Sequence, residues 1–120
     1  MDETPSQAEI VPGTLDAMVL SVLAEAPTHG YGVARAIRSR SGDAILVEEG
    51  TLYPALRRLE KNGLIRGDWR KSESNRRARY YELTEAGKRR LAADIDRWSR
   101  SSSAVNAVLG LTWAQFGGAS

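Results

Sequence analysis

The apolar residues of this chain change their spacing twice, and this change constrains the fold more than any other feature. Up to residue 63 they recur every three or four positions, as on the buried face of a helix. Between residues 64 and 83 they alternate with polar residues, as in a half-buried strand. From residue 84 onward the helical spacing returns. Such a pattern predicts a mainly α domain that contains one small β-hairpin.

The first half of the sequence predicts two helices and a short apolar segment. Thr14 can cap a helix that begins at Leu15, and Pro27 ends that helix. A second helix is predicted over about residues 31–40, because a glycine follows it directly. The apolar residues 45–47 are a candidate for a short strand.

A third helix is predicted in the segment Gly-Thr-Leu-Tyr-Pro-Ala-Leu-Arg-Arg-Leu-Glu-Lys-Asn-Gly that ends at Gly63. We expect it to begin near Gly50 or Thr51, because Pro54 is tolerated only in the first turn of a helix. One face of this helix is apolar and is expected to lie in the core: Leu52, Leu56 and Leu59.

The last part of the chain predicts an antiparallel hairpin and one long helix. The strands are expected over residues 64–71 and 78–83, because the connector 72–77 is polar and turn-prone. Thr84 can cap a final helix that extends to about Leu109. Three helices followed by a hairpin form a winged helix-turn-helix, in which the third helix enters the major groove of DNA and the hairpin is the wing.

The fold class we expect is therefore mainly α with a small β-hairpin: a winged helix-turn-helix plus a long C-terminal dimerisation helix. In this interpretation residues 1–13 are a flexible leader and residues 14–83 are the DNA-binding domain. Residues 84–110 are the dimerisation helix, and residues 111–120 are a tail.

Composition excludes several classes of function. The 120 residues suffice for one domain, and the absence of cysteine excludes disulfides and thiolate chemistry. A single histidine supplies no metal cluster, and no catalytic motif is present, so we expect no cofactor, no metal and no enzymatic activity. No apolar run is long enough to cross a membrane, and the acidic N-terminus lacks the features of a secretory signal. We therefore expect a cytoplasmic protein.

The charges are distributed unevenly along the chain. Residues 1–50 hold three basic and eight acidic residues, whereas residues 51–120 hold fourteen basic and seven acidic residues. The basic residues are densest between residues 66 and 79. This asymmetry favours a polyanionic partner, although charge runs are commonly no more than a solvated surface.

Five segments together resemble the PadR family of bacterial transcriptional regulators. They are Thr14-Leu-Asp, His29-Gly-Tyr-Gly, Gly50-Thr-Leu-Tyr-Pro-Ala-Leu-Arg-Arg-Leu-Glu, Gly63-Leu-Ile and Arg79-Tyr-Tyr-Glu-Leu-Thr-Glu-Ala-Gly. The resemblance covers about residues 14–110. It implies a dimeric winged-helix repressor that often responds to small molecules, and the single long C-terminal helix places the chain in the short subgroup of the family.

Topology, charge and resemblance together point to double-stranded DNA as a partner. Polar and basic side chains of the third helix and the hairpin are the candidate contacts, to phosphates more than to bases. They are Thr51, Tyr53, Pro54, Arg57, Arg58, Lys61, Arg70, Lys71, Arg76 and Arg77. Arg79 is the least certain basic residue because it shares a strand face with Tyr81, and Tyr31 is expected to pack structurally.

The last helix predicts a homodimer. Its apolar positions are spaced alternately by four and three residues, which defines a heptad seam: Leu91, Ile95, Trp98, Ser102, Val105 and Leu109. A helix over residues 85–109 is about 37 Å long, more than a small domain can cover. A second copy would cover the seam and would present two third helices to a pseudo-palindromic operator. The alternative is that this helix folds back on the first helix.

Trp98 lies in the middle of the seam and admits two interpretations. It is either a packing or dimer anchor, or part of a cavity between subunits that binds a small hydrophobic or aromatic effector. For the whole chain, the alternative to a DNA-binding repressor is a winged-helix module that binds other proteins without specific DNA binding.

Overall fold

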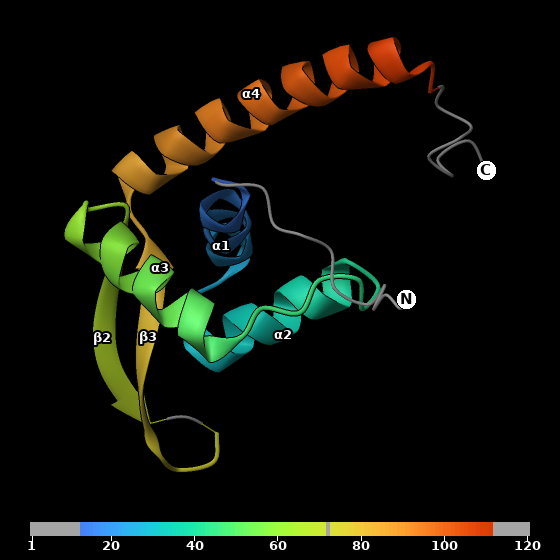
Figure 1. The fold of residues 1–120 in the computed structure, drawn as a ribbon. Helices are drawn as coiled ribbons and strands as arrows, with labels where there is room; N and C mark the ends of the chain where they lie inside the picture. Colours follow the sequence, from blue (N-terminus) through green and yellow to red (C-terminus); the bar gives the residue numbers. More distant parts are fainter. Residues whose placement is uncertain (1–12, 72, 112–120) are drawn as a thin grey trace.

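A computed structural model of the chain describes residues 13–71 and 73–111. Three helices and one short strand are followed by a β-hairpin, and the long last helix runs past the rest of the domain (Figure 1). In order they are α1 (Thr14–Glu25), β1 (Thr28–His29), α2 (Gly30–Arg40), α3 (Glu49–Lys61), β2 (Ile65–Lys71), β3 (Arg77–Leu83) and α4 (Glu85–Leu109). The predicted fold class, three helices, a hairpin and a long C-terminal helix, is confirmed.

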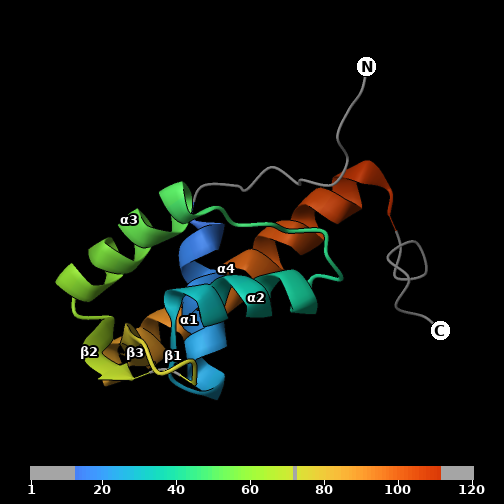
Figure 2. The same ribbon diagram turned by 90° about the horizontal axis from the view of Figure 1, so that it is seen from below.

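Helix α1 lies at the centre of the domain. It packs against α4 on one side and against α2 and α3 on the other (Figures 1 and 2). Its sequence is apolar around most of its circumference, as a helix covered on several sides must be. The core contains the leucines predicted for α3 and residues of the other elements: Leu15, Val19, Leu20, Val22, Leu23, Val33, Ile37, Leu52, Ala55, Leu56, Leu59, Ile65 and Tyr81.

The β-sheet has three strands, one more than the hairpin predicts. Its order is β1-β3-β2, and both pairs are antiparallel. The third strand is not the apolar segment 45–47, for which the strand prediction was wrong, but Thr28–His29. Ile45 and Val47 are partly buried against the core without strand pairing, so their burial alone explains why they are apolar.

Two helices begin differently from the prediction. Gly13, with φ of 92°, is the N-cap of α1, and Thr14 is its first residue. Helix α3 begins at Glu49, which leaves Pro54 in the second turn rather than the first. The missing N–H of Pro54 leaves the carbonyl of Gly50 without its helical donor; because Gly50 is exposed, water can hydrate that carbonyl.

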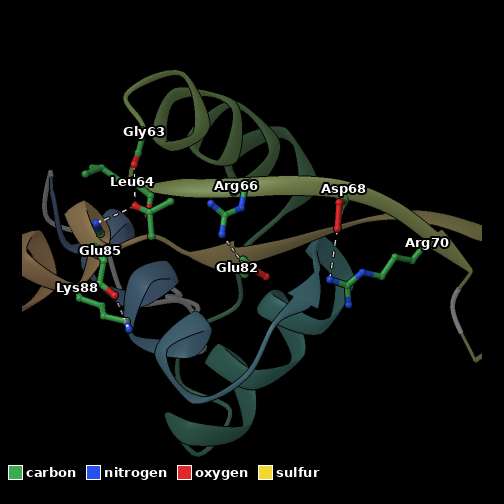
Figure 3. Close-up of polar contacts among 10 residues, drawn as sticks. Gly63, Leu64, Arg66, Asp68, Arg70, Glu82, Glu85 and Lys88 are labelled. Atoms are coloured by element: carbon green, nitrogen blue, oxygen red, sulfur yellow. Dashed lines mark hydrogen bonds and ion pairs between the residues drawn. The ribbon is translucent and has the colours of Figure 1, made fainter.

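The start of α4 is fixed by Thr84, as predicted. The Thr84 hydroxyl oxygen accepts a hydrogen bond from the Gly87 N–H at 3.0 Å, and it lies 2.7 Å from the carbonyl oxygen of Gly63. Figure 3 shows these contacts where the loop before β2 meets α4. A Cβ on Gly87 would lie 2.1 Å from the Leu64 carbonyl oxygen, so this close approach requires glycine.

Candidate nucleic-acid interface

Every residue of α3 that the sequence predicts as a DNA contact lies on the outer face of this helix. Its inner face is closed by the buried leucines, and the polar and basic residues lie outside. The exposed residues are Thr51, Tyr53, Pro54, Arg57, Arg58 and Lys61. One face of one helix therefore presents two hydrogen-bonding groups near its start and three positive charges farther along.

These positive charges are not equally available. The Arg58 guanidinium donates to the Asp16 carboxylate of α1, with Nη2 and Oδ1 2.6 Å apart. Within the described ranges, Arg57 and Lys61 have no ion-pair partner. Arg58 therefore ties α3 to α1 with part of its charge, whereas the charges of Arg57 and Lys61 are not neutralised by any described residue.

The start of α2 lies directly behind Tyr53. His29 caps α2, because its Nδ1 accepts the Gly32 N–H at 3.0 Å. A Cβ on Gly30 would lie 2.8 Å from the Tyr53 ring, so this glycine allows α2 and α3 to approach closely. Tyr31, for which we expected a packing role, stacks on the His29 ring with centroids 6.3 Å apart, but it remains 65% exposed. Arg35, a residue that we did not predict for the interface, lies over the Tyr31 ring.

The side of β2 and β3 that faces the core continues beyond the core, and we call this continuation the inner face of the wing. It holds the large side chains of Trp69, Arg77 and Arg79. Trp69 of β2 is 57% exposed, although it shares a strand face with the buried Ile65. The guanidinium carbons of Arg77 and Arg79 lie 5.2 and 5.7 Å from the Trp69 ring centroid. Arg77 is thus placed on an aromatic ring rather than free in a loop.

Arg79 is held by α3. Its Nη2 donates to Oε2 of Glu60 at 2.5 Å, and this hydrogen bond raises the pKa of the Arg79 guanidinium. Sequence reasoning missed this ion pair because the two residues are nineteen positions apart. The signal was the hairpin register, in which Arg79 lies opposite Trp69 and on the same strand face as the buried Tyr81.

The outer face of the wing, on the opposite side of the hairpin, contains paired charges. Arg66 lies 2.7 Å from Glu82 across the strands, and Arg70 lies 3.4 Å from Asp68 (Figure 3). Arg70, predicted to contact DNA, is thus partly neutralised and also lies over the Tyr80 ring.

The predicted wing residues Lys71 and Arg76 are exposed at the far end of the hairpin. In the part of the chain that the structure describes, neither has an ion-pair partner. With Arg77, they concentrate positive charge at the end of the wing.

A groove of about 630 Å³ separates the wing from α2 and α3. It is lined by aromatic and basic side chains of α2, α3, both wing strands and the loop between these strands, among them Tyr31, Arg35, Tyr53, Trp69 and Arg76. Glu73 is the one acidic residue that lines it among the described residues. Tyr53 of α3 and the inner face of the wing therefore line one groove of largely positive charge.

The predicted seam of α4 is divided by the structure. Leu91 packs against the core of its own chain, so the alternative of folding back on α1 holds for the beginning of the helix. Beyond it, Ile95, Trp98, Val105 and Leu109 are more than half exposed, and Ser102 is partly buried.

The α1-facing side of α4 also carries Asp94, which sequence reasoning missed. Its carboxylate is buried and accepts hydrogen bonds from Arg90 and Arg97 of the same helix. Charge-assisted hydrogen bonds of this kind offset the cost of burying a carboxylate.

The described helices offer no span for a membrane, because none is both long enough and apolar enough.

A three-helix core, a hairpin wing and an exposed basic third helix define a winged-helix DNA-binding protein. Residues 19–93 match the family model described as "Transcriptional regulator PadR-like family". The chain therefore belongs to the PadR family of transcriptional regulators, as its motifs indicated.

Solved structures agree with this assignment. A transcriptional regulator from Clostridium thermocellum is similar with a TM-score of 0.75 and 30% identity, over 83% of this chain and 97% of that one. A PadR family regulator from Clostridium difficile has a TM-score of 0.71 and 31% identity, over 81% and 99% of the two chains. One from Eggerthella lenta has a TM-score of 0.70 and 35% identity, over 81% and 82%.

Proposed function

We propose that this PadR-family regulator is a repressor that binds a pseudo-palindromic operator as a homodimer. In this proposal residues 14–83 bind DNA and residues 84–110 form the dimer. The observation that carries it is the surface on α3 and the wing, where Arg57, Lys61 and Arg76 are exposed without a partner in the described chain. Unpaired charges on an exposed surface are suited to DNA phosphates, which release their counterions when they are neutralised.

The dimer would place two such surfaces on one duplex. The exposed half of the α4 seam is an apolar surface that a second copy can cover, and a two-fold axis along it pairs each residue with its counterpart. Two α3 helices about 34–36 Å apart would then enter successive major grooves on one side of the duplex. This geometry accounts for the expected two-fold symmetry of the operator.

The test of the wing is the salt dependence of DNA binding. We expect Arg76→Ala combined with Arg77→Ala to lower the slope of log affinity against log salt by about 0.9 for each phosphate that is no longer neutralised. The control removes two charges from the side of α4 opposite the seam, Arg89→Ala combined with Arg100→Ala, and should leave the slope unchanged. Fluorescence anisotropy of labelled duplexes at several salt concentrations measures both.

Equal slopes for the wild type and the wing variant would exclude the wing from the interface. If the wild-type chain bound no duplex selected from a randomised pool at modest salt, a repressor function would be refuted. A protein-binding module would then be the better description.

The two arginines of α3 should differ in their effects. Arg57→Ala should weaken DNA binding without changing the melting temperature, because this side chain has no ion-pair partner in the described chain. Arg58→Ala should weaken binding less and should also reduce stability, because it leaves the Asp16 carboxylate, which is only 13% exposed, without its ion-pair partner. Paired binding and thermal-melting measurements check the order, and a reversed order would contradict it.

In this proposal the dimer is released from DNA when it binds a small hydrophobic or aromatic effector. Trp98 is 53% exposed within one chain, so a dimer would bring two indole rings to the subunit interface, where a flat ligand can stack. An effector that binds better to a dimer unsuited to DNA shifts the population away from the operator. Titration of Trp98 fluorescence in a Trp69→Phe, Trp113→Phe variant tests this, and unchanged emission would reject the ligands tried.

A further inference from the structure

Four side chains form a continuous row from α3 to the end of the wing, which we name the α3–wing row: Glu60, Arg79, Trp69 and Arg77. Glu60 accepts a hydrogen bond from Arg79 at 2.5 Å. The guanidinium carbons of Arg79 and Arg77 both lie over the Trp69 ring, 5.7 and 5.2 Å from its centroid. The row thus joins the helix that faces the major groove to a cation near the tip of the wing.

The backbone leaves room for this row at one position of β2. Gly67 shares a strand face with Trp69, and a Cβ there would lie 2.7 Å from Nε of Arg79. The Arg79 side chain therefore passes over Gly67 on its way from β3 to Glu60. Any other residue at position 67 would displace Arg79.

The members of the row differ in how their charge is compensated. Arg79 is partly buried and neutralised by Glu60, so it serves as a support. Arg77 is exposed, and no acidic side chain of the described residues pairs with it. Stacking on Trp69 restricts its orientation without removing its charge, and a guanidinium held in this way loses less freedom when it binds a phosphate.

We propose that Trp69 is a positioning residue, which together with the Glu60–Arg79 pair sets the location of the Arg77 guanidinium relative to α3. The inference rests on the proposed DNA-binding function and adds to it the row of side chains that holds the wing cation in place. The wing then meets the sugar-phosphate backbone at a fixed distance from the major groove that α3 occupies. A flexible basic loop would contribute charge but would not fix this register.

A double-mutant cycle in the full-length protein tests the coupling. The probe is a duplex selected from a randomised pool by the wild-type chain. We expect Arg77→Ala to weaken binding by roughly tenfold, the scale of one charge-assisted hydrogen bond, and Trp69→Ala to weaken it by a similar factor. The double variant should be no weaker than the worse of the two, and Trp69→Phe should bind within about twofold of the wild type because it keeps an aromatic ring.

Independent roles would give a different pattern. If the two fold-changes multiplied in the double variant, or if Trp69→Ala bound as the wild type does, the positioning role would be overturned. Absence of binding by the wild-type chain to any duplex in the pool would refute the proposed function itself. Because Trp69 is largely exposed, its substitution should leave the melting temperature nearly unchanged, and Trp69→Leu provides a second variant if the alanine variant does not fold.

Glu60→Ala separates positioning from simple charge. Removal of a negative charge near DNA should by itself strengthen binding. The α3–wing row predicts the opposite, a loss of several-fold, because Arg79 and the Trp69 ring lose their anchor on α3. Tighter binding would overturn the inference.

The matched control is Glu82→Ala on the outer face of the hairpin, where this carboxylate pairs with Arg66 (Figure 3). It removes the same charge without touching the row. We expect it to leave binding unchanged or to strengthen it slightly, and a loss equal to that of Glu60→Ala would overturn the special role of the row.

Discussion

Truncation of one seam residue, Ile95→Ala, should weaken the dimer without unfolding the protomer. Ile95 is 57% exposed in the single chain, so a partner can still cover more than half of it. Full burial of an isoleucine side chain is worth about 1.5–3 kcal/mol. The remaining part is therefore worth about 1–1.5 kcal/mol for each copy.

Symmetry doubles this contribution, because both copies lose the same side chain. A loss of about 2–3 kcal/mol per dimer corresponds to a dissociation constant that rises by about 30- to 140-fold. The protomer should remain folded, since alanine is a better helix former than isoleucine and the side chain lies largely outside the core. Sedimentation equilibrium at several protein concentrations, with circular dichroism on the same samples, measures both quantities.

The control is Val108→Ala, which makes a similar truncation on the same helix. Val108 is 86% exposed but lies beside the seam rather than on it. Its truncation should therefore weaken the dimer less than Ile95→Ala does. A larger effect at Val108 would show that the partner approaches another face of α4, and a wild-type chain that sediments as a monomer throughout the micromolar range would refute the dimer.

Three further predictions concern the stability of the fold. Burial raises the pKa of Tyr81 above its ordinary value near 10, so above about pH 10 the unfolded chain releases this proton before the folded chain does. The free energy of unfolding should then fall as the pH rises from about 10. Urea unfolding should show a shallower fall for Tyr81→Phe than for the wild type. Identical pH dependence in the two proteins would contradict this. Gly87→Ala should destabilise the protein by about 1–3 kcal/mol, because its Cβ would meet the Leu64 carbonyl. Gly50→Ala, a helical glycine with open space around it, should instead stabilise it by about 0.5–1 kcal/mol in the same unfolding assay.

Local signals in the sequence predicted most of the fold. Leu52, Leu56 and Leu59 define the buried face of α3 by their spacing alone, and Thr84 is the N-cap of α4 as its residue type indicated. The pairing of Thr28–His29 with β3 has no such signal. It joins segments about fifty residues apart, and a two-residue strand shows no periodicity.

The candidate interface was predictable in its members but not in their contacts. Spacing and charge place Arg57, Arg58 and Arg77 on exposed surfaces, where the structure also has them. Sequence alone does not distinguish the unpaired Arg57 from Arg58, which is bound to an aspartate 42 positions earlier in the chain. Such distinctions depend on how α1 and α3 cross, which is a property of the packed core.

The heptad seam of α4 shows where periodicity reaches its limit. A spacing of four and three identifies an apolar stripe, but it does not say which surface covers each part of it. The structure assigns Leu91 to the core of its own chain and leaves Ile95 and Trp98 largely exposed. Because α1 covers only the first part of a 25-residue helix, a change in the angle between α1 and α4 would move the exposed half of the seam as a rigid arm. In the proposed dimer, any ligand that alters this angle would therefore also alter the spacing of the two α3 helices.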